Sequence, residues 1–222
     1  YMYSRFAYQA AHQVTSLFEG ASAIQKELGA PPDKCDVVSN GIPLENFINI
    51  PIKKPGGWID IGAIGRVTPI KDIKTMLYTF SQLKENIPET RLHILGGIDD
   101  EEYYAECQAL IDFLNLKDVH FTGYVDTGEY MRQLDFTILT SISEGQPLAL
   151  IESMAAQRPV VATNVGAVRE LIEGGKDDNL GKAGYCVPMM DQTNLLRAMT
   201  ELCHNTTKRE RMGKIEIGRA HV

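Results

Sequence analysis

The sequence contains no long apolar run and no excess of positive charge. None of its apolar runs approaches the roughly 18 residues that a membrane-spanning helix needs, which argues against such a helix in this stretch of chain. The 222 residues include 22 Lys and Arg against 29 Asp and Glu, a net charge of -7. Because nucleic acids and anionic membranes are bound through a basic face, this balance argues against a general binder of either. It is still compatible with a small basic pocket for a phosphate.

Cysteine and histidine are also scarce. The four cysteines are widely scattered and form no CxxC pair: Cys35, Cys107, Cys186 and Cys203. They are typical of small core residues in a reducing compartment, rather than of a disulfide or zinc framework, and they favour a cytoplasmic location. The five histidines are equally dispersed, and no two have the spacing of metal ligands.

Both ends of the sequence are unusual. The chain begins at Tyr1 with neither an initiator methionine nor the charged and apolar regions of a signal peptide. Residues 216–222 (EIGRAHV) resemble a translated sequencing adaptor, so we expect them to be non-native and to pack against nothing. We therefore expect this sequence to be part of a longer protein.

What the sequence does contain is a regular alternation of β-rich and helical patterns. Hydrophobic residues make up 44% and charged residues 23%, as in an ordinary globular chain. Strands are expected at Val14–Phe18, Asp36–Ser39, Trp58–Ile64, Arg91–Leu95, Val119–Thr122, Phe136–Leu139, Val160–Thr163 and Tyr185–Val187. Helices are expected at Ala21–Leu28, Ile73–Lys84, Glu101–Leu114, Gly128–Gln133, Leu148–Ala156, Val168–Ile172 and Asn194–Cys203.

This order predicts an α/β fold. Strand, helix, strand at such spacing forms βαβ units, hence a Rossmann-like parallel sheet with helices on both faces. Pro, Lys and Gly in residues 50–57 are typical of a linker. We therefore expect the tail of one domain at 1–40, a linker at 41–57, a second domain at 58–205 and a C-terminal segment at 206–215. Ligands of such sheets bind at the carboxyl ends of the strands.

The first stretch that carries chemistry is 62–72 (GAIGRVTPIKD). Glycines end a strand, and Arg66 and Lys71 follow just before an amphipathic helix. A helix N-terminus with a guanidinium and an ammonium suits an anion such as a diphosphate, although two solvated loop charges would give the same pattern. Asp72 fits a helix start. The stretch is not a dinucleotide fingerprint, because Ile64 stands where the second glycine is needed, and it is not a Walker loop.

The second stretch is 141–152 (SISEGQPLALIE). Pro147 suits the first residue of a helix. This places Glu144 on the loop at a strand's carboxyl end and Glu152 in the helix's second turn, while Gly145 and Gln146 can offer backbone N–H groups to a phosphate. Glu152 is alternatively a surface carboxylate. The eight-residue spacing is weak by itself, since Glu19 and Glu27 share it.

Three further stretches follow strands. Residues 158–172 (RPVVATNVGAVRELI) predict a buried strand, a glycine turn and a short helix, on which Glu170 faces either a cleft or solvent. Two more strand ends carry glycines, at 95–97 (LGG) and 123–125 (GYV). They either admit a nucleotide base against the backbone, near Gly96 and Val125, or form tight turns.

Together these motifs resemble a known family. NGI at 40–42, GR with Lys71, LGG at 95–97, SEG with Glu152, and PVVAT at 159–163 with Gly166 and Glu170 follow the order seen in the C-terminal half of retaining family-4 glycosyltransferases of GT-B fold. Residues 1–39 resemble the end of that family's acceptor domain. Stretches 69–75 and 140–148 are most similar to the PelF branch, which serves exopolysaccharide synthesis. The sequence departs from the family at Gln146, usually an aromatic, and at Gln157, usually a glycine.

The resemblance implies a nucleotide-sugar donor, of the UDP-glucose kind, and a glycan acceptor. Arg66 and Lys71 would hold the diphosphate and stabilise the leaving nucleotide, Glu144 would contact the sugar, and Glu152 would accept hydrogen bonds from the ribose. Backbone N–H groups from Gly145 through Gln146 to Leu148 would also meet the diphosphate, and Gly96 and Val125 would line the donor site. No metal or other cofactor is expected. Implied partners are a membrane exopolysaccharide synthase complex but no nucleic acid.

Two other classes of function remain open. A nucleotide-sugar 2-epimerase shares the GT-B architecture, although the context of Glu144 and Glu152 favours transfer. A non-catalytic nucleotide-binding module is the other alternative. Because GT-B sites lie between two domains, we expect this chain by itself to bind the donor weakly and to transfer no sugar.

Overall fold

The computed structural model describes residues 2–174 and 180–220. Its main feature is a six-stranded sheet in which every neighbouring pair is parallel, with the order β5-β4-β3-β6-β7-β8. The strands are β3 (Ile59–Ile64), β4 (Thr90–Leu95), β5 (Val119–Gly123), β6 (Phe136–Leu139), β7 (Val160–Thr163) and β8 (Gly184–Val187). The predicted parallel α/β fold is confirmed. The strand order reverses between β3 and β6, which creates a topological switch point there.

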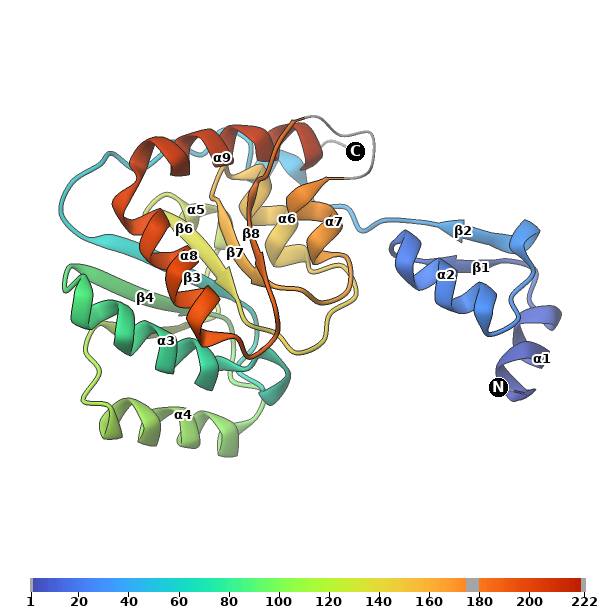
Figure 1. The fold of residues 1–222 in the computed structure, drawn as a ribbon, viewed down its shortest axis with the longest axis horizontal. Coiled ribbons are helices and arrows are strands. Elements are labelled where there is room, and N and C mark those ends of the chain that lie inside the picture. Colours follow the sequence, from blue (N-terminus) through green and yellow to red (C-terminus); the bar gives the residue numbers. More distant parts are fainter. Residues whose placement is uncertain (1, 175–179, 221–222) are drawn as a thin grey trace.

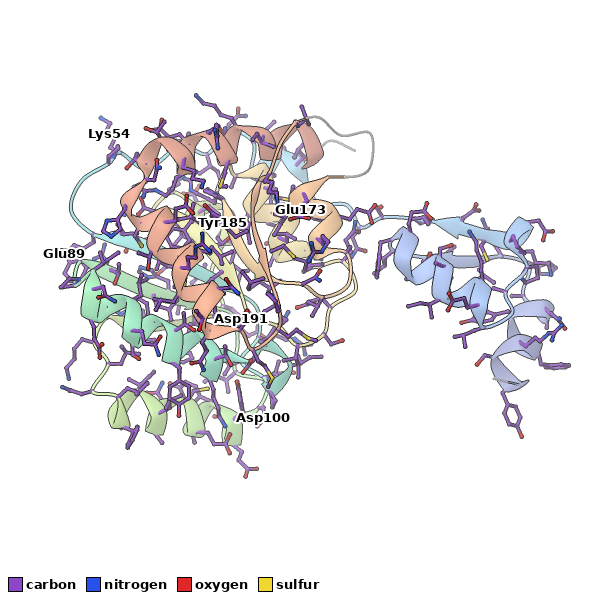
Figure 2. The ribbon with its side chains drawn as sticks, viewed as in Figure 1. Lys54, Glu89, Asp100, Glu173, Tyr185 and Asp191 are labelled. Atoms are coloured by element: carbon purple, nitrogen blue, oxygen red, sulfur yellow. The ribbon has the colours of Figure 1, made fainter. Side chains whose placement is uncertain are left out.

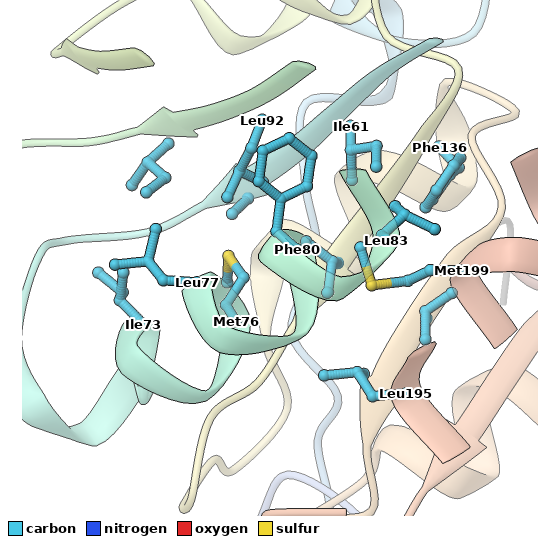
Figure 3. Close-up of a cluster of buried hydrophobic side chains, with 14 of the residues drawn as sticks. Ile61, Ile73, Met76, Leu77, Phe80, Leu83, Leu92, Phe136, Leu195 and Met199 are labelled. Atoms are coloured by element: carbon cyan, nitrogen blue, oxygen red, sulfur yellow. The ribbon is translucent and has the colours of Figure 1, made fainter. Parts of the chain in front are cut away.

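Helices cover both faces of this sheet (Figure 1). One face carries α3 (Ile73–Asn86), α4 (Glu101–Phe113) and α8 (Gln192–His204), and the other carries α5 (Thr127–Met131), α6 (Leu148–Ala155) and α7 (Val168–Glu173). Figure 3 shows the larger core, where Phe80 and Leu83 of α3 pack over Leu92 of β4. Apolar residues thus fill both sides of the central strands, as a doubly covered parallel sheet requires.

Aspartates begin four of these helices, among them α4 and α8. Asp100 accepts a hydrogen bond from the backbone N–H of Tyr103 at 2.9 Å, and Asp191 accepts one from Asn194 at 3.0 Å (Figure 2). Each side chain satisfies one of the N–H groups that the first helical turn leaves without a backbone partner. Within the described residues, no helix is long and apolar enough to span a bilayer.

Residues 2–40 form a small lobe beside the sheet (Figure 1). It consists of α1 (Met2–Ala10), β1 (Val14–Ser16), α2 (Glu19–Glu27), the 3-10 turn η1 (Pro32–Lys34) and β2 (Cys35–Val37), and β1 and β2 pair in parallel. The two strands and α2 lie where the sequence predicts them. Helix α1 was not predicted.

The segment 41–57 packs on the sheet domain rather than hanging free. It contains the 3-10 turn η2 (Leu44–Asn46), and the buried side chains of Phe47 and Ile50 pack against Met131 and Leu134. The predicted linker therefore contributes a part of the domain's core. The domain boundaries themselves stay predictions.

The chain's last helix, α9 (Thr206–Ala220), was not expected. It packs on α6 and α8, and the side chain of its residue Met212 is buried. The predicted segment 206–215 is therefore helical. The expectation that residues 216–222 pack against nothing concerns side chains that lie outside the described ones, and it stays a prediction.

All four cysteines lie in described parts of the chain, and all are free. Cys107 and Cys203 are buried, whereas Cys35 and Cys186 are half-exposed. Burial raises the pKa of Cys107 to about 11 and that of Cys203 to about 12. These two are inert core residues, as the sequence predicts.

A buried ionic cluster lies near the amino end of β3, away from the switch point. Asp60 is 1% exposed, and its carboxylate accepts hydrogen bonds from Arg91 Nε at 2.6 Å and Lys53 Nζ at 2.5 Å. Its Oδ1 also lies 2.7 Å from Nε2 of His93. Burial alone would raise the pKa of Asp60, but the hydrogen bonds from His93, Arg91 and Lys53 outweigh it and hold this pKa well below its usual range.

We therefore expect the protein to lose stability in acid. A carboxyl group whose pKa is depressed by folding stabilises the fold fully above its unfolded pKa of about 3.9, and this contribution disappears as the pH falls through the folded pKa. For Asp60 the loss should be about 2 kcal/mol in the free energy of unfolding, measured by urea denaturation at a series of pH values from 7 downward. Asp60→Asn, whose side chain does not titrate, should show a smaller decrease over the same range. Equal decreases in the two proteins would show that Asp60 does not carry the acid sensitivity.

Candidate functional site

The predicted site residues gather at the switch point. Ile61 and Gly62 of β3 pair with Phe136 and Thr137 of β6, so the carboxyl ends of these two strands lie side by side. The loop from Gly65 to Asp72 leaves one strand, and the loop that carries Glu144 leaves the other. Crevices between such diverging loops are where open α/β sheets bind ligands.

The first loop ends in a constrained turn. Asp72 adopts a left-handed conformation (φ 45°), and its side chain accepts a hydrogen bond from the N–H of Thr75 at the start of α3. The hydroxyl of Thr140, from the other side of the switch point, donates to the carbonyls of Lys71 at 2.8 Å and Asp72 at 3.0 Å. The predicted role of Asp72 at a helix start is confirmed, and Thr140 fixes the backbone that carries Lys71.

Lys71 and Glu144 meet across the switch point. Lys71 Nζ lies 2.6 Å from Glu144 Oε1, and the hydroxyl of Ser141 donates to the same oxygen at 2.7 Å. The side chains of Lys71 and Glu144 are only 22% and 15% exposed. This pair is therefore more shielded from solvent than an ordinary surface ion pair.

Arg66 is paired as well. Its guanidinium lies 2.6 Å from Asp99 Oδ2, and the two side chains are 61% and 46% exposed. The sequence predicts that Arg66 and Lys71 are two cations available to bind an anion. In the structure, each is already paired with a carboxylate. Asp99 was not among the predicted residues. An incoming anion would exchange with these carboxylates rather than enter a free cationic pocket.

The loop of Gly145 and Gln146 presents backbone N–H groups. Gly166 (φ 53°) packs against this loop so closely that a Cβ atom there would lie 2.3 Å from the carbonyl oxygen of Glu144 and 2.2 Å from that of Gly145. The N–H of Ala167 donates to the Gly145 carbonyl at 2.8 Å. Since N–H and C=O point in opposite directions in a trans peptide, the N–H groups of Gly145 and Gln146 face away from α7. Neither has a protein acceptor within the described part of the chain.

Helix α6 begins at Leu148, the start of the predicted range, but Pro147 is not its first helical residue. Pro147 has an extended ψ of 120° and caps the helix, and Leu148 is the first helical residue. Glu152 still falls in the second turn, where it is half-buried, and burial raises its pKa. No described side chain or backbone N–H pairs with its carboxylate. Such a carboxylate is a ready hydrogen-bond acceptor for a ligand.

The side chain of Gln146, for which the sequence predicts only a backbone N–H contact, already makes a hydrogen bond. Its Oε1 accepts a hydrogen bond from the backbone N–H of Asn40 at 2.5 Å. Its backbone carbonyl also accepts from Asn40 Nδ2, whereas its backbone N–H has no acceptor among the described residues. Glu170 is exposed on α7. Glu19, which shares the eight-residue spacing with Glu27, is exposed on α2 in the small lobe.

Gly96 and Val125 also lie along this edge of the sheet. Gly96 (φ 147°) approaches the first loop so closely that a Cβ atom would lie 2.3 Å from the carbonyl oxygen of Gly65. Tyr124 lies over Gly97, and Val125 next to it is 38% exposed. These glycines thus allow the loops after β3, β4 and β5 to pack together. Among the described residues, no group of His, Cys, Asp and Glu is placed to hold a metal ion.

Comparisons with known proteins assign the family. The profile of glycosyl transferases group 1 matches residues 47–218, so the chain belongs to this family. It is 31% identical over 186 residues to WcaL of Salmonella typhimurium, named as a glycosyltransferase of colanic acid biosynthesis, and 30% identical over 152 residues to the glycosyltransferase EpsD of Bacillus subtilis. These matches cover 79% and 68% of this chain, but 44% and 39% of the relatives. The chain thus spans less than half the length of these relatives.

A solved structure shares the fold. HepE from Anabaena, crystallised with UDP and glucose, superposes with a TM-score of 0.82 at 19% identity, covering 99% of this chain and 61% of HepE. The expected resemblance to a glycosyltransferase of GT-B fold is confirmed for the group 1 family and for the fold.

Proposed function

We propose that this chain binds the diphosphate of a nucleotide sugar, a UDP-sugar, across the switch point. The observation that supports this most directly is the Lys71–Glu144 pair, which stands between two loops and beside the unpartnered N–H groups of Gly145 and Gln146. Cations and backbone N–H groups at the start of a helix are the usual partners of phosphate.

The individual roles follow from position. Arg66 and Lys71 leave their carboxylates to hold the diphosphate, which releases Glu144 to bind the sugar. Glu152, half-buried and unpaired, accepts hydrogen bonds from the ribose hydroxyls. The backbone from Gly145 to Leu148 binds phosphate oxygens, and the loops at Gly96 and Val125 line the site of the nucleotide base. Since paired cations and N–H groups neutralise the diphosphate, the site needs no metal.

The whole protein, we infer, is a retaining family-4 glycosyltransferase of the PelF branch that transfers a hexosyl group to a growing exopolysaccharide or another glycan. The name of WcaL, a relative assigned to colanic acid biosynthesis, supports a polysaccharide acceptor. A cytoplasmic location fits the four free cysteines, and the acceptor places the protein beside a membrane synthase complex. A 2-epimerase would isomerise the free nucleotide sugar, so product analysis with and without acceptor separates the two activities.

Binding by the 222-residue chain tests the donor site. We expect UDP to bind weakly and GDP and ADP to bind less well. We expect no sugar to be transferred, because the relatives are longer than this chain and their additional length would provide the acceptor side of the site. Glu152→Gln should weaken UDP binding about ten-fold at pH 7, as expected for a charged hydrogen bond to ribose. Calorimetric titration of both proteins measures this.

The pH dependence provides a second readout. Because burial raises the pKa of Glu152, its charge is lost at a pH above the usual glutamate value of about 4.3, and UDP affinity should fall there as the pH decreases. The phosphate of UDP titrates equally for both proteins, so the difference between wild type and Glu152→Gln isolates Glu152. A difference that stays constant with pH would exclude Glu152 as the ribose ligand.

A further inference from the structure

The small lobe forms hydrogen bonds to the loop of Gly145 and Gln146 through Asn40. Its backbone N–H donates to Gln146 Oε1 at 2.5 Å, and its side-chain Nδ2 donates to the Gln146 carbonyl at 2.9 Å. The two residues are 106 positions apart. Leu17, at the end of β1, also lies against this loop, since a Cβ atom on Gly145 would be 3.0 Å from its Cδ1.

These contacts fix the backbone of Gln146 on both sides. The peptide that precedes it is held by the hydrogen bond from Ala167 to the Gly145 carbonyl, and the peptide that follows it is held by Asn40 Nδ2. The direction of the Gln146 N–H depends on the first of these peptides, and the entry into α6 at Pro147 depends on the second. Asn40 thus supplies the second of two anchors.

We propose that Asn40 and Gln146 form a positioning pair that holds the phosphate-binding N–H groups in place, so that donor affinity depends on how the small lobe is seated. This inference rests on the proposed function. A glutamine suits the role because its side chain can accept from the backbone of Asn40 while its own carbonyl accepts from the Asn40 side chain. The aromatic residue usual at this position in the resembling family has no side-chain carbonyl oxygen to accept the hydrogen bond from the Asn40 backbone.

UDP binding to variants of the whole chain tests the proposal. Asn40→Ala and Gln146→Met each remove one hydrogen bond and should weaken UDP about five-fold; Asn40→Asp, which sets a carboxylate against the Gln146 carbonyl, should weaken it about ten-fold. Uridine, which lacks phosphates, should bind all of them as it binds wild type when followed by NMR. In the free proteins, the amide of Ala167, which donates to the Gly145 carbonyl, should exchange with solvent faster than in wild type.

The control is Asn86→Ala. Asn86 Nδ2 donates to the Gln82 carbonyl at the same 2.9 Å, but it lies exposed at the far end of α3. This variant should change neither binding nor exchange of the Ala167 amide. Equal loss of UDP and uridine affinity in the Asn40 variants, or unchanged affinity and exchange, would overturn the positioning role. A wild-type chain that binds none of UDP, GDP and ADP would overturn the proposed function instead.

Discussion

Replacing Lys71 with alanine should lower the turnover of sugar transfer about 10²–10³-fold, the loss typical of a preorganised electrostatic contact, and should weaken donor binding much less. Lys71 is fixed by Thr140 through its backbone and stands at the switch point, where charge on the departing diphosphate would develop. An ammonium there acts more strongly in the transition state than in the ground state. Arg66→Ala should act in the same direction. Turnover and the donor Michaelis constant would be measured after joining this chain to the acceptor domain of a relative.

Two glutamate variants complete this experiment. Glu144→Gln should also lower turnover, because its carboxylate is next to the expected sugar. The same change releases Lys71 from its ion pair, so the affinity for free UDP should not fall. Glu19→Gln alters an exposed glutamate of the same eight-residue spacing and should change neither quantity. If the Glu144 and Glu19 variants behave alike, the assigned site is wrong.

Replacing Arg158 with methionine should reduce the free energy of unfolding by about 3–5 kcal/mol, because it strands several buried carbonyl groups at once. The Arg158 side chain is 1% exposed and donates to the carbonyls of Met131 at 3.0 Å, Ala156 at 2.7 Å and Pro51 at 2.8 Å. It thereby connects α5, the end of α6 and the segment 41–57. A loss of this size is a large part of the stability of most domains.

Urea denaturation at pH 7 would measure the effect of Arg158→Met. The matched control is Arg132→Met, which changes an exposed arginine at the end of α5 that is paired with Glu129 one turn earlier. A surface pair of this kind contributes well under about 1 kcal/mol. Similar losses in both variants would show that the buried hydrogen bonds of Arg158 add little.

The sequence predicted the sheet because its strands carry strong local signals. Apolar runs such as Phe136–Leu139 and Val160–Thr163 are bounded by turns, and the strands have the expected bounds to within a few residues. Helix α9 escaped prediction because residues 206–215 are mostly polar, and among the side chains described in this range Met212 is the one buried apolar side chain. The segment 41–57 was predicted to be a linker because of its prolines and glycines. Its buried Phe47 and Ile50 do not form a helical or strand periodicity that would predict burial.

The site divides in the same way. Lys71 and Glu144 could be expected to meet, because parallel strands bring their carboxyl ends to one edge. The partner of Arg66 could not, since Asp99 lies 33 positions away and no local pattern links the two. Asn40 reaches Gln146 over 106 positions. Contacts of this range depend on how the finished loops pack, which residue spacing does not encode.

The two cation–carboxylate pairs at the switch point have a consequence for the speed of binding. With Arg66 facing Asp99 and Lys71 facing Glu144, the two cations are each balanced by a carboxylate, and the whole chain carries -7. An anionic ligand is therefore not drawn in by a long-range field, as it would be at an open basic funnel. When the proposed diphosphate leaves, the same carboxylates would be close enough to pair with their cations again. For the nucleotide proposed here, the arrangement would exchange fast capture for easy release.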